Sequence, residues 1–263
     1  MTSQAELGIF GGSGFYSFLD DVEEITVETP YGPPSAPVSI AEIEGTRVAF
    51  LPRHGKGHEL PPHRINYRAN VWALKELGVK RVIGPCACGA LQPTLELGDF
   101  VVCDQYVDRT SGRADTFYDG PEVMHVSAAE PYCDDLGHTL VETARELGIP
   151  VREGGTVVVI QGPRFSTVAE SRWYSSMGWD VVNMTQYPEA HLARELELCY
   201  AAVAMVTDYD VGVHGAGAVS SWTVARVFAE NNERLRALLL AAVPRIGPQP
   251  ADACSDALAK ARI

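Results

Sequence analysis

The sequence lacks the cysteine spacing of a disulfide framework. Its six cysteines are scattered along 263 residues without a CxxC pair, and several lie inside apolar runs. This pattern predicts reduced, mostly buried thiols in a cytoplasmic protein. Long apolar runs are also missing, since none approaches the roughly 20 residues of a membrane helix. The first residues, MTSQAELGIF, contain neither the basic nor the apolar region that a signal peptide needs.

Positive charge is scarce as well. Lys and Arg total 21 against 34 Asp and Glu, which gives a net charge of −13. Long-range repulsion therefore disfavours nucleic acid and anionic membranes as partners. We expect small-molecule partners, and an anionic one would need its own local cluster of positive groups.

Strand-like and helical patterns alternate along the chain, and no internal repeat is visible. With 46% hydrophobic residues, the chain has enough apolar material for one α/β domain covering residues 1–263, with a frayed tail after about residue 248. The expected strands are 7–10, 38–43, 46–51, 81–85, 100–107, 155–160, 180–184 and 199–210. The expected helices are 66–77, 131–147, 167–177, 188–198 and 220–243.

The most informative stretch is CYAAVAMVTDYD, residues 199–210. Its continuous apolar run predicts a strand buried on both faces of a sheet. Asp208 and Asp210 then lie at the C-terminal end of that strand, where open α/β sheets bind ligands. The alternatives are a solvated loop, or an Asp that caps the next helix.

Two other strands end in segments suited to anions. Gly11–Gly14 places Ser13 in a glycine-rich turn whose N–H groups can point at an anion, although it is not the GxGxxG pattern of dinucleotide sites. A plain turn remains the alternative. Residues 52–64 form the most basic stretch of the chain. There we favour anion binding by Arg53 and His54, because the Gly and Pro residues oppose the helix that an H-x3-H metal pair needs.

Residues 108–130 form a long polar loop that carries His125. Loops of this length inside a compact domain are usually functional or lie at an interface. From the residues alone, the chain is predicted to be an anion-binding α/β enzyme with two carboxylates in its site.

Several longer motifs then occur in a recognisable order: GIFGGSG, LPRHGKGH, NYRANVWALKELG, FYDG, AEPYC, QGPRFSTVAES, VVNMT and AMVTDYD. In this order they resemble the trimeric purine nucleoside phosphorylase family, from about Leu7 to Pro248. The resemblance implies a central mixed β-sheet flanked by helices, a homotrimer, and inorganic phosphate as the co-substrate, with no cofactor and no metal. The implied reaction is phosphorolysis of a nucleoside, closest to that of S-methyl-5′-thioadenosine and possible for adenosine.

Carried over position by position, the resemblance also implies roles for individual residues. Phosphate would be bound by Ser13, Arg53, His54, Cys86, Ala87 and Thr185. The nucleoside would be bound by Phe165 near the base, Met184 under the ribose, Asp208, Tyr209 and Asp210 at the purine, and His125 at the 5′ end in a neighbouring subunit. Ser166, Ser221 and Val224 would tune the choice of substrate.

The chemistry explains the carboxylates. Phosphorolysis releases purine as an anion, so an acid that protonates the leaving group is valuable. Burial near a second carboxylate should raise the pKa of Asp208, so that it can donate to N7 while Asp210 accepts from the 6-amino group. An ionised Asp repels a 6-oxo group, whereas Asn could donate to it. A mismatch of about 1–3 kcal/mol therefore favours adenine.

Two alternatives for the substrate remain open at this point. The apolar Val224 suits a methylthio group at the 5′ position, but it can equally be a core-facing helix residue. A phosphorylase of 6-oxopurine nucleosides or methylthioinosine is the main competing function. A nucleotide-dependent oxidoreductase and a non-catalytic nucleoside binder are more distant alternatives.

The chain departs from the family pattern at two places. Cys86 stands where a Thr hydroxyl commonly faces phosphate, and a thiol is a weak donor. Gln186 and Tyr187 are bulkier than expected near the sugar.

Overall fold

The computed structural model describes residues 4–12, 22–211, 213–215, 217–247, 253–259 and 261–262. Its strands are β1 (Leu7–Gly11), β2 (Glu23–Ile25), β3 (Val38–Ile43), β4 (Thr46–Pro52), β5 (Arg81–Ala90), β6 (Phe100–Cys103), β7 (Gln105–Arg109), β8 (Val151–Glu153), β9 (Thr156–Ile160), β10 (Val181–Asn183) and β11 (Cys199–Tyr209). Its α-helices are α1 (Tyr67–Glu76), α2 (Asp134–Glu146), α3 (Val168–Ser176), α4 (Gln186–Glu195) and α5 (Ser221–Ala242).

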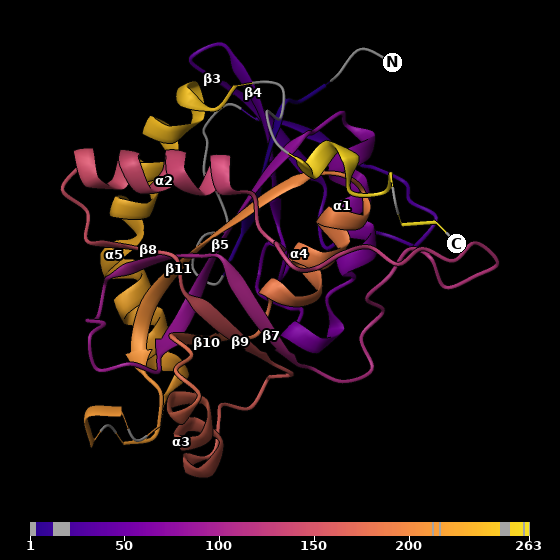
Figure 1. Cartoon of the computed structure of the whole chain (residues 1–263). Helices are drawn as coiled ribbons and strands as arrows, with labels where there is room; N and C mark the ends of the chain where they lie inside the picture. The colour runs from indigo at the N-terminus through magenta and orange to yellow at the C-terminus, as the bar shows by residue number, and fades with distance from the viewer. Residues whose placement is uncertain are drawn as a thin grey trace.

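All eleven strands belong to one mixed sheet, as predicted (Figure 1). The main path runs β2-β3-β4-β1-β5-β10-β9-β7, and β11 leads from β5 through β6 to β8. The hairpin between β3 and β4 turns at Glu44 and Gly45, which both have positive φ (47° and 86°). Two such residues give the type I′ turn that matches the twist of paired strands, and this turn joins the two strands expected at 38–43 and 46–51.

The middle of the sheet is β5, which pairs along its whole length with the parallel strand β11. On its other edge, β1 pairs with residues 81–83 and β10 pairs with residues 89 and 90. Among the described residues, no strand pairs with that edge between these two points. The sheet therefore opens beside residues 84–88, and this opening positions the site. The expected strand 81–85 was too short, because the small residues at 86–90 continue it.

Helices cover the two faces of the sheet (Figure 1). Along β11, Tyr200 and Ala202 pack into a core with α1 and α4, whereas Ala201 and Val203 pack into a core with α2 and α5. Burial on both faces is what the continuous apolar sequence of this strand predicted. No helix that the structure describes is long and apolar enough to cross a membrane.

One other expectation was wrong. Residues 100–107 form two strands, because the chain leaves β8 and β11 at Asp104 and joins β9 instead. In the described part of the tail, a short turn follows. Residues 253–256 form a 3₁₀ turn with Cys254 buried, and Arg262 bridges to Met124.

Candidate active site

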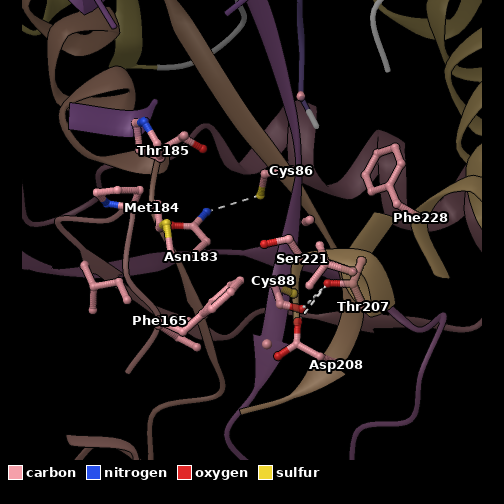
Figure 2. Close-up of a pocket in the computed structure, with 18 of the residues that line it drawn as sticks. Cys86, Cys88, Phe165, Asn183, Met184, Thr185, Thr207, Asp208, Ser221 and Phe228 are labelled. Atoms are coloured by element: carbon pink, nitrogen blue, oxygen red, sulfur yellow. Dashed lines mark hydrogen bonds between the residues drawn. The ribbon is translucent and has the colours of Figure 1, made fainter. Parts of the chain in front are cut away.

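A cavity of about 630 Å³ lies beside the opening in the sheet. It is lined by the ends of β5, β10 and β11, by the loop after β4, and by residues preceding or within α3 and α5. In Figure 2, Asp208 and Phe165 lie at one end of the cavity, and Cys86 and Thr185 lie at the other. The volume falls within the range of small-molecule sites, and the polar groups are confined to a few positions.

A β-bulge brings Asp208 into this cavity. The register between β11 and β5 shifts between Val206 and Asp208, so that Asp208 lies opposite Gly89. The extra residue, Thr207, donates from its hydroxyl to the carbonyl of Cys88 at 3.2 Å and to Asp208 Oδ2 at 3.0 Å. A bulge re-aims the side chains that follow it. Gly89 completes the fit, because a Cβ there would lie 2.8 Å from Asp208 Oδ1.

The pKa of Asp208 is raised to about 7, mainly by burial; the hydrogen bond from Thr207 lowers it in part, and the nearby Asp210 adds to the rise. The carboxyl group therefore carries a proton in a substantial part of the molecules near neutrality. A carboxylic acid of this kind can act as a general acid. The raised pKa that the sequence predicted for Asp208 agrees with its surroundings here.

Asp210 lies two residues further along and is 2% exposed. Its Oδ2 is buried and has no hydrogen-bond partner among the described residues. Burial raises its pKa, and the nearby hydroxyls of Ser171 and Ser166 partly offset that effect. An unpartnered buried acceptor costs about 1–3 kcal/mol, so this oxygen is suited to accept an N–H donor from a ligand.

At the other end of the cavity, Arg53 is almost fully buried. Its Nε and Nη2 donate to the two carboxylate oxygens of Glu189 at 2.8 and 2.7 Å, and its Nη1 donates to the carbonyl of Pro85 at 2.7 Å. Tyr200 also donates to Glu189 at 2.7 Å. Gly12 packs against this group, since a Cβ there would lie 3.1 Å from Nη1. Two of the five N–H groups of a guanidinium remain for a ligand.

His54 is neutral at physiological pH. Its pKa is lowered to about 3, mainly by burial; the hydrogen bond to Leu60 opposes this shift, and the charges of Arg53 and His58 add to it. Its Nδ1 lies 2.8 Å from the carbonyl of Leu60, which can only accept, so Nδ1 carries the proton. The neutral ring then has an acceptor at Nε2. His54 can therefore meet a protonated phosphate oxygen, but it does not supply a positive charge.

The thiol of Cys86 is held among amide side chains. Asn183 Nδ2 donates to its sulfur at 3.2 Å and Gln186 Nε2 at 3.4 Å, and the first contact is drawn in Figure 2. Gln186 is thus buried beside Cys86, and its Oε1 accepts a hydrogen bond from Tyr132. The bulk of this residue fills space behind the cavity. The Asn183 Oδ1 is buried without a partner among the described residues and is a further acceptor in the wall.

The structure brings most of the predicted residues together. The cavity is lined by Arg53, His54, Cys86, Ala87, Phe165, Ser166, Met184, Thr185, Asp208, Asp210, Ser221 and Val224. Tyr209 is not among the lining residues, and its hydroxyl donates to Glu96 at 2.8 Å, so its contact with the base stays a prediction. His125 is exposed, and its N–H donates to the carbonyl of Ala261. Ser13 lies outside the described residues.

Sequence reasoning missed several residues of this site. Gly89, Asn183, Thr207 and Phe228 line the cavity, and Glu189 holds Arg53. Thr207 precedes Asp208 directly, but nothing in the sequence marks a bulge there. Phe228 lies one helical turn after Val224 and could have been found from the helical period.

Comparison with known proteins places this arrangement among enzymes. A family model described as the phosphorylase superfamily matches residues 6–244. A purine nucleoside phosphorylase of Streptomyces coelicolor is 54% identical, over 91% of this chain and 89% of the relative. An S-methyl-5′-thioadenosine phosphorylase of Thermofilum pendens is 51% identical over 99% of both chains. The structure of methylthioadenosine phosphorylase from Schistosoma mansoni in complex with adenine superposes with a TM-score of 0.94. The two sequences are 38% identical, and the superposition covers 98% of this chain and 99% of the Schistosoma mansoni chain.

Proposed function

This chain belongs to the phosphorylase superfamily, and we propose that it is a pentosyltransferase that cleaves S-methyl-5′-thioadenosine with inorganic phosphate. The products are adenine and 5-methylthioribose 1-phosphate, and adenosine is a second substrate. The observation that carries the proposal is the pairing of a protonatable carboxyl group, Asp208, with an unpartnered buried acceptor, Asp210 Oδ2, at one end of the cavity. These two groups are complementary to N7 and the 6-amino group of a leaving adenine.

Phosphate binds at the opposite end, against Arg53, His54, Cys86, Ala87 and Thr185, with Ser13 completing the set. Because Arg53 is already paired with Glu189, it contributes its remaining N–H groups more than a net charge. His54 accepts from the protonated oxygen of hydrogen phosphate through Nε2. Fixed donors and acceptors of this kind favour one orientation of the nucleophile and contribute through positioning.

The reaction then needs only groups of this chain and the two substrates. As the glycosidic bond breaks, negative charge develops on the purine and positive charge on the sugar. Asp208 donates its proton to N7, and phosphate attacks the sugar carbon from the other side. Met184 packs under the ribose and Phe165 lies near the base. No cofactor takes part, and no metal takes part in this step.

The 5′ end of the nucleoside faces α5. Val224, Ala225 and Phe228 give that wall an apolar surface. A methylthio group gains from burial there at about 25 cal/mol per Å² of apolar area, whereas a 5′-hydroxyl loses a partner. Ser221 and Ser166 border the same cavity and adjust the preference. This favours methylthioadenosine over adenosine.

The protein assembles as a homotrimer and acts in the cytoplasm. The loop at 108–130 supports the first point, because it presents an exposed His125 outside its own cavity. In a trimer that residue reaches the 5′ end of a nucleoside in the neighbouring subunit. Six cysteines that form no disulfide support the second point.

A four-substrate assay tests the function. Base release from methylthioadenosine, adenosine, inosine and methylthioinosine is measured with and without phosphate. We expect phosphate-dependent release, fastest from methylthioadenosine and slower by one or two decades from the 6-oxo compounds. Equal or faster turnover of inosine would instead support a 6-oxopurine phosphorylase. The Streptomyces coelicolor relative is named as a purine nucleoside phosphorylase, which is consistent with that alternative.

A further inference from the structure

Three cysteines meet at the start of β11, at the other end of that strand from Asp208. The sulfur atoms of Cys133, Cys199 and Cys254 all lie within 4.8 Å of one another, and all three residues are buried. None of them lines the cavity. They come from three separate segments: the residue before α2, the first residue of β11, and the 3₁₀ turn at Ala253–Asp256. The short yellow turn lies close to the start of β11 in Figure 1.

The surrounding backbone holds these sulfurs in place. The N–H of Cys133 donates to the carbonyl of Tyr200 at 2.9 Å, and the N–H of Cys199 donates to that of Lys80 at 3.0 Å. The turn with Cys254 is fastened by Leu258, whose N–H donates to Glu197 Oε1 at 3.2 Å. Each of the three segments that carry these cysteines is therefore fixed by a hydrogen bond to another part of the chain.

The spacing suits one metal ion better than it suits a disulfide. Around a tetrahedral ion with metal–sulfur bonds of about 2.3 Å, the sulfurs lie roughly 3.8 Å apart. Sulfurs already within 4.8 Å reach that spacing through small side-chain shifts. A disulfide would use two of the three and leave the third aside. Ser255 and Asp256 beside Cys254 are exposed, so the turn offers a short route from solvent.

A helix N-terminus lies beside the cluster. α2 begins directly after Cys133, and the N–H of Leu136 donates to the Cys133 sulfur at 3.5 Å. Three thiolates around a divalent ion carry one net negative charge, which a helix N-terminus stabilises.

We propose that Cys133, Cys199 and Cys254 form a site for one thiophilic d¹⁰ metal ion, of the Zn²⁺ class, with water as the fourth ligand, and that this site fastens the C-terminal turn to α2 and β11. Each coordinating thiol releases its proton to solvent as the ion binds. The site is separate from phosphorolysis.

The experiment uses Cd²⁺ as a spectroscopic probe of thiolate ligands. The full-length protein is reduced, treated with a chelator, desalted and titrated with Cd²⁺, and the bound metal is counted after gel filtration. We expect one Cd²⁺ per chain, an ultraviolet thiolate-to-cadmium band, and a rise in Tm upon binding. Zn²⁺ should displace the band competitively.

Cys254→Ser is the informative variant, because the residue lies in a terminal turn and its loss leaves the sheet intact. Its Cd²⁺ affinity should fall by about 100-fold or more, and the rise in Tm should vanish. Cys103→Ser is the matched control, a buried strand cysteine outside the cluster, and it should bind Cd²⁺ as the wild type does. Substoichiometric binding by the reduced wild type, or equal binding by Cys254→Ser, would overturn the proposal. The proposal would also be overturned if the cluster were stable only with a disulfide between Cys133 and Cys199.

Discussion

Arg53 and Glu189 form a buried two-point ion pair beside the cavity, with both partners only 1% exposed. The two hydrogen bonds fix the plane of the guanidinium, and Tyr200 fixes the carboxylate from behind. Glu189 is therefore a positioning residue for Arg53. The pair explains how a strongly charged side chain can be buried in the wall of a site that must also bind an anion.

Glu189→Gln should weaken the binding of phosphate more than the binding of the nucleoside. The amide cannot accept both guanidinium hydrogen bonds, so Arg53 is left partly unpaired, and the free energy of unfolding should fall by about 3–5 kcal/mol. The KM for phosphate should rise by a larger factor than the KM for methylthioadenosine. Tyr200→Phe removes a single hydrogen bond from the same carboxylate and should cost only about 1 kcal/mol. Equal stability of Glu189→Gln and wild type in a urea titration would contradict this account.

Asp208→Asn should slow the reaction and change its pH profile. The amide cannot donate a proton as an acid, so kcat for methylthioadenosine should fall by about 10²–10⁴-fold. In the wild type, kcat should decline as pH rises above about 7, because Asp208 then loses its proton. The variant should lack that decline.

The same variant should turn preference toward 6-oxo bases, since Asn can donate to O6. The ratio of kcat/KM values for inosine and adenosine measures this. An unchanged ratio with both activities intact would show that Asp208 does not read position 6.

Asp208 should also make stability depend on pH. Its folded pKa of about 7 lies above the ordinary value of 3.8. Its contribution to stability is therefore fully present below pH 3.8 and is lost as pH rises toward about 7. Above that pH the carboxyl is ionised in both states and its contribution no longer changes. Asp208→Asn should lack this term, so its stability relative to wild type should be greater at pH 8 than at pH 4. Parallel urea titrations at the two pH values provide the check.

Gly89→Ala should impair catalysis more than folding. The new Cβ would lie 2.8 Å from Asp208 Oδ1 and 3.1 Å from Val182, so the acid must move. A displaced acid should lower kcat by about tenfold to 100-fold. Gly247→Ala is the control, because no atom of the described residues lies within 4 Å of its Cβ position. Wild-type kcat for Gly89→Ala would mean that the close approach to Asp208 has no catalytic consequence.

The sequence by itself determined the elements and much of the site. Apolar runs and helical periods placed most strands and all five α-helices, because burial on one or two faces leaves a periodic trace. The ordered motifs alone assign Arg53, Cys86, Met184 and Asp208 to a common site. Local sequence patterns predicted structure correctly where that structure depends on residues only a few positions apart.

Tertiary structure decided what depends on contacts between distant residues. The opening in the sheet arises because β1 and β10 use different parts of one edge of β5, and no local pattern records that choice. The pairing of Arg53 with Glu189 joins positions 136 residues apart. The neutrality of His54 follows from burial and from the charge of its neighbours, and the meeting of Cys133, Cys199 and Cys254 follows from three separate segments. Desolvation and long-range packing set these properties, so only the folded chain contains them.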